Sequence, residues 1–322
     1  ESIVMGIGDD RSSSQAGPVA MDKLLTGALE RLDKAEMSDG IVGLTTGFRD
    51  LDEATAGFEK QDLIIVAGRP GMGKSAFMMN LVEAALLADA GAVPVFSLEM
   101  PKDQLMVRMI SGLGRVNQNH MKAGTLTPDE WHRVTKATEI LHDKPLFIDD
   151  SPALNTAQMT TRARRIVKSH GPLAMIVVDY IQLMGSSALY AGNRVQEISE
   201  ISRNLKRMAK EFNCPVVAGS QLNRGLEARP DKRPLMSDLR ESGSIEQDAD
   251  IVMGLYRDEV YHSDSPDKGI AEVLILKQRN GPIGRKRLAF HGMFTRFEDL
   301  VTMETRYEEF DNAPSRAEEG GF

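Results

Sequence analysis

The sequence is poor in cysteine, in long apolar runs and in net positive charge, and each shortage excludes something. Its one cysteine, Cys214, rules out an internal disulfide framework. No apolar run approaches the roughly 18 residues that cross a bilayer, and no secretory signal is visible, so we expect a cytoplasmic protein without membrane contact. The formal net charge of −8 gives no general attraction to nucleic acid, so any DNA contact must come from basic residues placed locally.

The strongest signal that is present is a glycine-rich stretch that fits G-x-x-x-x-G-K-[ST] at every fixed position. It follows the apolar run 63–67, which is typical of a buried parallel strand, and it precedes a helix-forming stretch over 76–87. Backbone N–H groups turned inward by the glycines, together with the helix start, make a cradle for phosphate. The sequence therefore predicts binding of a nucleoside triphosphate, ATP with Mg²⁺, by Gly68, Arg69, Pro70, Gly71, Met72, Gly73, Lys74 and Ser75.

Within this stretch Lys74 is expected to reach the β- and γ-phosphates, and Ser75 to ligate Mg²⁺. Asp179 ends a second apolar run, which is the Walker B arrangement, and it is expected to hold the same ion through water. Two more polar residues follow apolar runs, at the strand ends where ligands collect in parallel sheets. Glu99 is a candidate general base for the attacking water, the alternative being a solvated loop glutamate. Gln221 is placed to sense a γ-phosphate, the alternative being a bond to nearby backbone.

The remaining pattern divides the chain into four parts. Residues 1–18 are rich in Ser, Gly and Asp without a period and are expected to be disordered, as is the acidic tail 311–322. Residues 19–37 carry apolar positions at helical spacing, so a helix is expected that packs either on its own domain or on a neighbouring subunit. Residues 38–310 are expected to form one α/β domain with a mostly parallel central sheet flanked by helices. Thr127 and Thr156 are expected to cap helices of this domain.

A polar stretch after Gln221 carries a small surplus of positive charge. Between positions 224 and 240 the net charge is +2, with Arg224, Arg229, Lys232, Arg233 and Arg240 set against Glu227, Asp231 and Asp238. A surplus of this size does not establish DNA binding.

In their order and spacing, the motifs resemble one family, the bacterial DnaB-type replicative DNA helicases, specifically their RecA-like C-terminal motor domain. The resemblance runs from about Gly43 to Glu298, and the helix that starts at Met21 matches the family's linker helix. The motifs that carry it are Gly68–Ser75, Phe96–Pro101, Val178–Leu183, Ser220–Arg224, Asp238–Asp250 and Lys277–Pro282.

The resemblance implies a RecA-like P-loop NTPase core, assembled as a ring of six subunits with ATP bound between neighbours. Lys74, Ser75, Glu99, Asp179 and Gln221 would serve the nucleotide from one side. Lys277 and Arg279 would reach the γ-phosphate on the adjacent subunit, with Arg279 as the arginine finger. Judged without the resemblance, these two residues would be exposed cations at the end of a strand.

The resemblance also implies a DNA side. Arg240 would supply charge to phosphates of single-stranded DNA in the central channel, Glu241 and Gly243 would make further backbone contacts, and Arg194 is a secondary candidate. The motor would move 5′ to 3′ on the encircled strand and unwind duplex, with a helicase loader as a partner. The family's N-terminal collar domain recruits primase. Nothing ahead of Met21 can form that domain, so primase binding and part of the hexamer's stability are doubtful for this chain.

Two other functions compete with a helicase motor. A RecA-type recombinase or related filament ATPase shares the phosphate loop and Asp179, but it gives no reason for the linker helix or for the pair Lys277 and Arg279. A fragment that binds nucleotide but cannot assemble would neither hydrolyse ATP nor unwind DNA.

Overall fold

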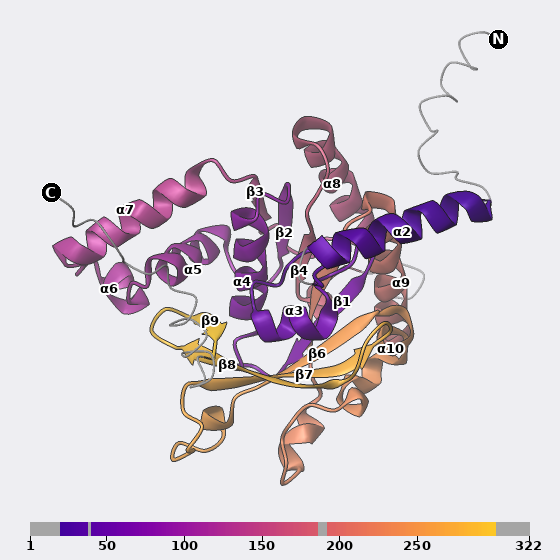
Figure 1. Ribbon diagram of the computed structural model, residues 1–322. Coiled ribbons are helices and arrows are strands. Elements are labelled where there is room, and N and C mark those ends of the chain that lie inside the picture. The colour runs from indigo at the N-terminus through magenta and orange to yellow at the C-terminus, as the bar shows by residue number, and fades with distance from the viewer. Residues whose placement is uncertain (1–19, 38–39, 186–191, 301–322) are drawn as a thin grey trace, which may run out of the picture.

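Within the residues that the computed structural model describes (20–37, 40–185 and 192–300), the apolar runs form a nine-stranded sheet (Figure 1). The predicted disordered segment 1–18 and the predicted tail 311–322 lie outside these residues. In spatial order the strands are β3 (Leu146–Asp149), β2 (Val93–Ser97), β4 (Ile176–Asp179), β5 (Val216–Gln221), β1 (Leu63–Gly68), β6 (Ile251–Tyr256), β7 (Ile270–Gln278), β8 (Gly284–His291) and β9 (Arg296–Asp299).

The first six strands in this order pair in parallel, and β7, β8 and β9 extend the sheet in antiparallel pairing. The connection 279–283, which contains Asn280 and Gly281, joins β7 to β8 as an antiparallel hairpin. In Figure 1 β7 and β8 cross the lower half of the molecule. The predicted α/β fold with a mostly parallel sheet is therefore confirmed.

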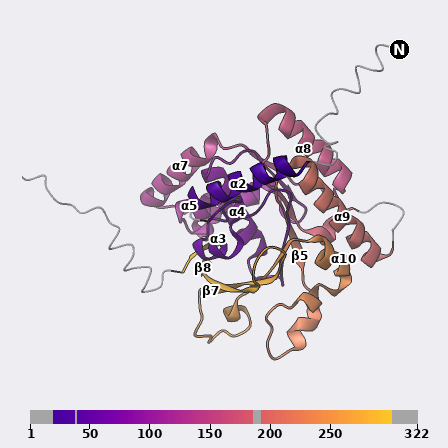
Figure 2. The ribbon, with the colours of Figure 1, turned by 45° about the vertical axis from the view of Figure 1, so that its right-hand side comes forward.

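Helices cover both faces of the sheet. One face carries α3 (Arg49–Thr55), α4 (Lys74–Leu87) and α5 (Lys102–Gly114), with α6 (Gln118–Ala123) and α7 (Pro128–His142) packed beside α5. The other face carries α8 (Thr156–His170), α9 (Arg194–Phe212) and α10 (Gly243–Asp248). In both views α5 and α7 lie on the opposite side of the molecule from α8 and α9 (Figures 1 and 2). Short 3₁₀ helices follow several strand ends: η2 (Ile181–Leu183), η4 (Arg224–Ala228), η5 (Met236–Ser242) and η6 (Asp258–Val260).

Strand β1 shows why the central runs are apolar at every position. All six of its residues are buried. Ile64 and Val66 belong to the core cluster under α4, whereas Leu63, Ile65 and Ala67 belong to the cluster under α8 and α9. A strand covered on both faces has no solvent side, so the alternation typical of a half-exposed strand is lost.

The predicted N-cap residue is correct for α7 and wrong by one position for α8. Thr127 and Glu130 form a capping box at the start of α7. The N-cap of α8 is Asn155, whose side chain accepts a hydrogen bond from the N–H of Gln158 at 2.9 Å, and Thr156 is the first helical residue. Asparagine is at least as good an N-cap as threonine, so the neighbouring residue takes the role. Cys214 is buried, and burial raises the pKa of its thiol to about 12, as expected of a packing residue.

The predicted helix at the N-terminal side is present as α2 (Met21–Met37). Its apolar stripe does not pack on the described part of the same chain, because Leu24, Leu25, Leu29 and Leu32 are each more than half exposed. The alternative in which the stripe packs on its own domain is therefore not what the structure contains. No helix among the described residues combines the length and the apolar character needed to cross a bilayer.

Candidate nucleotide-binding site

The residues predicted for the nucleotide lie together at one edge of the sheet. Strands β2, β4, β5 and β1 are parallel neighbours, so their carboxyl ends meet at this edge. Glu99 follows β2, Asp179 ends β4 and Gln221 ends β5. The phosphate loop, Gly68–Ser75, begins at the last residue of β1. Ligands bind at such edges in parallel sheets.

The phosphate loop turns sharply into α4. Gly71 and Gly73 have φ values of +85° and +92°, a conformation that favours glycine. Helix α4 begins at Lys74 with Gly73 as its N-cap, so the positive end of the helix dipole adjoins the loop. A Cβ on Gly73 would lie 3.0 Å from Cζ of Phe297 in β9, so the antiparallel end of the sheet packs directly against the loop.

Lys74 and Asp179 face each other at this edge. The Nζ of Lys74 lies 3.3 Å from Oδ1 of Asp179 and 4.0 Å from the ring centre of Tyr180. Asp179 is buried, yet its Oδ1 accepts no hydrogen bond from any described residue. A Cβ on Gly219 would lie 3.0 Å from that oxygen and 3.2 Å from Cε of Lys74, so both side chains pack closely against the glycine.

These features fit a magnesium ion. A buried carboxylate oxygen that accepts no hydrogen bond suits a hard cation or its bound water. The described residues contain no group of three or more His, Cys, Asp or Glu side chains that could hold a metal ion by themselves. An ion at Asp179 and Ser75 would therefore also need phosphate and water oxygens, which Mg²⁺ commonly uses.

Glu99 is exposed just past β2, so it is solvated and also borders the site. Burial raises the pKa of the Tyr180 phenol, and the negative charges of Glu99 and Asp179 raise it further. Burial lowers the pKa of the Arg108 guanidinium on α5, and the same two carboxylates oppose that shift. Arg108, which the sequence did not single out, therefore lies close enough to both carboxylates to feel their charge.

Gln221 is held through its backbone by another side chain. The Oε1 atom of Gln182 accepts a hydrogen bond from the N–H of Gln221 at 3.1 Å. Its Nε2 donates to the carbonyl of Gln221 at 3.3 Å and to Oγ of Ser220 at 3.1 Å. The backbone pairing of β4 with β5 ends at Val178. Beyond that point, the side-chain amide of Gln182 bonds to the backbone of Gln221 in place of a strand. The sequence pattern alone assigns Gln182 no role.

Arg69 and Met72 point their side chains away from the loop. Nε of Arg69 donates to Glu227 at 2.9 Å, and its NH1 donates to the carbonyl of Leu222 at 2.9 Å. Met72 is buried and its sulfur accepts a hydrogen bond from the N–H of Arg257. Phosphate binding by Arg69 and Met72 thus remains a prediction about their backbone N–H groups.

Lys277 and Arg279 lie at the opposite edge of the sheet. Lys277 is paired with Val252 near the start of β6, level with the start of β1 rather than with the phosphate loop at its end. The length of β1 separates the two edges by about 15 Å. Nζ of Lys277 donates to the carbonyls of Glu246 and Ala249 at the end of α10. Burial lowers the pKa of Lys277, and the neighbouring charge of Arg279 lowers it further.

The predicted DNA-binding residues belong to η5, α10 and the start of α9. The side chains of Arg240 and Glu241 are outside the described part of the chain. Gly243 is exposed at the first position of α10, and a Cβ there would meet open space. NH2 of Arg194 donates to the carbonyl of Gln182 at 2.7 Å, and its NH1 donates to Glu197 at 2.9 Å. DNA contact by these four residues stays a prediction.

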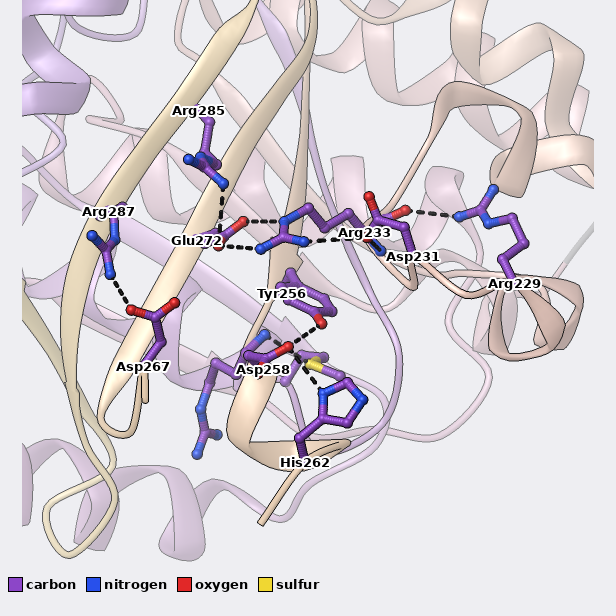
Figure 3. Close-up of polar contacts among 12 residues, drawn as sticks. Arg229, Asp231, Arg233, Tyr256, Asp258, His262, Asp267, Glu272, Arg285 and Arg287 are labelled. Carbon is purple, nitrogen blue, oxygen red and sulfur yellow. Dashed lines mark hydrogen bonds and ion pairs between the residues drawn. The ribbon is translucent and has the colours of Figure 1, made fainter. Parts of the chain in front are cut away.

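Two arginines of the polar stretch after β5 form ion pairs with carboxylates of the same chain. Arg229 donates to both carboxylate oxygens of Asp238 at 3.1 and 2.8 Å. Arg233 donates to both oxygens of Glu272 in β7 at 2.7 and 2.8 Å, and its guanidinium lies 4.8 Å from the ring centre of Tyr256 (Figure 3). Asp238 is already counted in the +2 surplus, so only the pair of Arg233 with Glu272, which lies outside that stretch, offsets part of it.

Arg257 is a further residue at the nucleotide edge that the sequence did not single out. Its NH1 donates to the carbonyl of Gly71 in the phosphate loop at 3.0 Å, and its guanidinium lies 3.7 Å from the ring centre of Phe290. The residue follows β6, the other neighbour of β1. Glu99 was predicted to be a site residue because it is a charged residue just past a core strand. Arg257 has the same position relative to β6, so the same reasoning could have identified it.

Comparison with known proteins gives consistent matches. A family profile described as DnaB-like helicase C terminal domain matches residues 43–299. The chain is 52% identical over 306 residues to the replicative DNA helicase DnaB of Haemophilus influenzae, a match that covers 94% of this chain and 65% of that protein. It is 45% identical over 292 residues to the replicative DNA helicase DnaB of Geobacillus stearothermophilus, covering 90% of this chain and 63% of that protein. The chain thus spans slightly less than two thirds of the length of these relatives.

Solved structures agree with the sequence matches. The ATPase domain of G40P superposes with a TM-score of 0.83 at 35% identity, covering 88% of this chain and all (100%) of that one. A DnaB-like replicative helicase, described together with its interactions with primase, gives a TM-score of 0.80 at 34% identity, covering 93% of this chain and 71% of that one. The fold is the predicted RecA-like core, and the matches favour a helicase over a recombinase. With its profile match, its relatives and its fold in agreement, the chain belongs to the family of DnaB-like helicase C-terminal domains.

Proposed function

We propose that the chain is the ATP-driven motor of a replicative DNA helicase, acting as a ring of six copies that moves 5′ to 3′ along single-stranded DNA. The observation that carries the proposal is the division of the site between two edges of the sheet. The phosphate loop and the strand-end residues share one edge, whereas Lys277 and Arg279 lie at the other. Such a site is complete only where two copies adjoin.

One edge of each copy binds ATP. The loop N–H groups and the start of α4 receive phosphate oxygens, and Lys74 donates to the β- and γ-phosphates. Ser75 and Asp179 would hold Mg²⁺, whose charge would offset that of the phosphates. Glu99, exposed at the end of β2, accepts the proton of the attacking water. Gln221 donates to the γ-phosphate from the end of β5.

The opposite edge of a neighbouring copy supplies Lys277 and Arg279. Their separation from the phosphate loop of their own chain supports action on another chain. A guanidinium placed where negative charge develops in phosphoryl transfer contributes on the order of 10³–10⁵ in rate. Lys277 adds a second positive charge beside it.

The DNA contacts come from the segment that leads into α10. Arg240 supplies charge, Glu241 and Gly243 supply further contacts, and Arg194 is a secondary contact. Binding to phosphates carries no base information, so it is expected to tolerate any sequence and to weaken with salt. A ring brings six copies of the segment to one strand, which compensates for the acidic net charge of each chain.

Helix α2 is proposed to dock on the neighbouring copy. Its exposed leucines form the apolar stripe of an amphipathic helix, and burying such a stripe stabilises an assembly. A helicase loader is a further partner of this motor.

The proposal is tested on a forked duplex with fluorescent strands. With ATP and Mg²⁺, the chain should separate a fork that offers a 5′ single-stranded arm on the encircled strand, and the Lys74→Ala chain should not. Strand exchange without unwinding would favour the recombinase alternative. Nucleotide binding without hydrolysis at every protein concentration would favour the assembly-deficient alternative.

A further inference from the structure

Asp250 occupies the turn between α10 and β6, and only 8% of its side chain is exposed. Its Oδ2 atom accepts a hydrogen bond from the N–H of Leu63, the first residue of β1, at 2.8 Å. The same oxygen contacts Nζ of Lys206 on α9. Its Oδ1 atom lies 3.3 Å from Nε of Arg279. One buried carboxylate therefore joins β1, α9 and the residue just past β7.

Backbone hydrogen bonds also join Asp250 to Leu63 and to Arg279. The N–H of Asp250 donates to the carbonyl of Leu63 at 2.9 Å, and the N–H of Arg279 donates to the carbonyl of Asp250 at 3.0 Å. NH2 of Arg279 donates to the carbonyl of Gln247 at 2.7 Å. Arg279 is thus held by its main chain, by one guanidinium hydrogen bond to Gln247 and by the ion pair with Asp250.

We propose that Asp250 is a positioning residue for Arg279, one that fixes the guanidinium so that its remaining N–H groups face a neighbouring copy's γ-phosphate. The inference rests on the proposed function. The guanidinium is anchored on one side and open on the other, because 49% of the Arg279 side chain is exposed. A long side chain held in one orientation before its ligand arrives loses less conformational freedom on binding.

The burial of Asp250 separates this contact from an ordinary surface ion pair, which contributes little. Its Oδ2 is fixed by Leu63 and Lys206, so the direction of Oδ1 toward Arg279 is fixed as well. The contact also connects Arg279 to the base of β1, the strand that carries the phosphate loop of the same chain at its other end.

The test is the Asp250→Asn substitution, which keeps the shape of the side chain. If the amide oxygen keeps the contacts to Leu63 and Lys206, the amide NH₂ meets Nε of Arg279, donor against donor. We expect ATP affinity to be retained and kcat to fall on the order of 10- to 100-fold, the scale of misplacing a catalytic group. A fall in kcat could also follow from general damage, so subunit mixing decides.

Two chains are mixed before assembly in equal amounts. In a mixture of Arg279→Gln with Glu99→Gln chains, random assembly leaves about one site in four with both residues, so ATP hydrolysis should reappear. Asp250→Asn chains mixed with Glu99→Gln chains should regain hydrolysis in the same way. Asp250→Asn chains mixed with Arg279→Gln chains should regain none, because neither supplies a working arginine.

The outcomes are distinct. If the Arg279→Gln and Glu99→Gln mixture recovers but the Asp250→Asn and Glu99→Gln mixture does not, Asp250 does not act through Arg279. Recovery in the Asp250→Asn and Arg279→Gln mixture would overturn the inference equally. If even the first mixture fails, the shared site of the proposed function is contradicted, and the role of Asp250 falls with it.

A second variant covers the case in which Asp250→Asn does not fold. The double substitution Asp250→Asn with Lys206→Met removes both members of the ion pair, so no buried charge is left without its partner. It should show the same pattern in the mixtures. A folded double variant that hydrolyses ATP at the wild-type rate would contradict the inference.

Discussion

The ammonium of Lys74 lies 3.3 Å from a buried oxygen of Asp179 that accepts no hydrogen bond from the described residues. The lysine comes from the start of α4 and the aspartate from the end of β4, so the pair joins the phosphate loop to the neighbouring part of the sheet edge. An oxygen so placed is available to a cation that arrives with the nucleotide. Once ATP binds, we therefore expect Lys74 to contact the phosphates and Asp179 to contact the metal ion.

The Asp179→Asn substitution tests the metal-binding role of Asp179. Asparagine keeps the shape but removes the negative charge that would hold Mg²⁺, so we expect kcat for ATP to fall on the order of 10²–10³-fold, as when one electrostatic contact to the transition state is lost. Steady-state ATPase assays across a Mg²⁺ titration measure the change. Lys74→Ala is the comparison, and it should abolish nucleotide binding itself. Unchanged hydrolysis by Asp179→Asn would exclude the proposed metal role.

Gly219 is expected to be needed for its lack of a side chain. A Cβ there would lie 3.0 Å from Asp179 and 3.2 Å from Lys74, so Gly219→Ala should crowd the site. Overpacking of this kind costs about 1–3 kcal/mol, and we expect ATP to bind on the order of 10-fold more weakly. Titration with a fluorescent ATP analogue measures it. Gly284→Ala is the matched control, since a Cβ at that strand position meets open space.

Gln182 should matter for turnover more than for binding. Leucine at this position cannot bond the N–H and carbonyl of Gln221, so the glutamine at the end of β5 loses its support. Leaving a fully buried backbone group unpaired costs about 1–3 kcal/mol, and the part-buried groups of Gln221 should cost somewhat less. We expect Gln182→Leu to lower kcat about 10-fold with little change in KM.

Gln182→Glu provides the graded comparison for that experiment. It can still accept from the N–H of Gln221 but cannot donate to its carbonyl, so its kcat should lie between the wild-type and Gln182→Leu values. Equal activity of all three proteins would show that the amide is not needed.

Asp62 gives a pH prediction with a defined sign. Burial, with the negative charges of Asp250 and Glu59, raises its pKa from 3.8 to about 6, against the lowering effect of Lys206 and Arg279. The folded chain therefore favours the protonated form. The stability this provides is present below pH 4 and is lost as the pH rises through 6.

Asp62→Asn mimics the protonated form at every pH. It should stabilise the protein by about 1 kcal/mol at pH 8, after allowance for partial solvent exposure, and by nothing at pH 4. Thermal unfolding at the two pH values measures the difference. The exposed Asp264→Asn provides the control, and an equal effect of Asp62→Asn at both pH values would contradict the assignment.

Much of the site could be predicted because its residues occupy positions that the sequence marks. Lys74, Asp179, Glu99 and Gln221 all follow or end apolar runs, and parallel strands bring their carboxyl ends to one edge. The helix α2 was predictable from periodicity, but where its stripe packs was not, since the spacing is the same for either partner.

The supporting contacts could not be predicted, because they depend on the register of distant strands. Asp250 meets Leu63 across 187 positions in the sequence, and Gln182 meets Gln221 across 39. Arg69 belongs to the phosphate motif, yet its side chain donates hydrogen bonds to the segment after β5. The pattern of a motif fixes backbone geometry and says little about the direction of side chains at its variable positions.

The measurement that tests the account most directly is the ATPase rate per chain as a function of protein concentration, taken together with the mass in solution. Because Arg279 lies at the opposite edge of the sheet from its own phosphate loop, the rate per chain should rise steeply from near zero and level off as the assembly forms. Arg279→Gln chains should assemble over the same range and stay inactive. A full rate at concentrations where the protein is a monomer would contradict the division of the site between two copies.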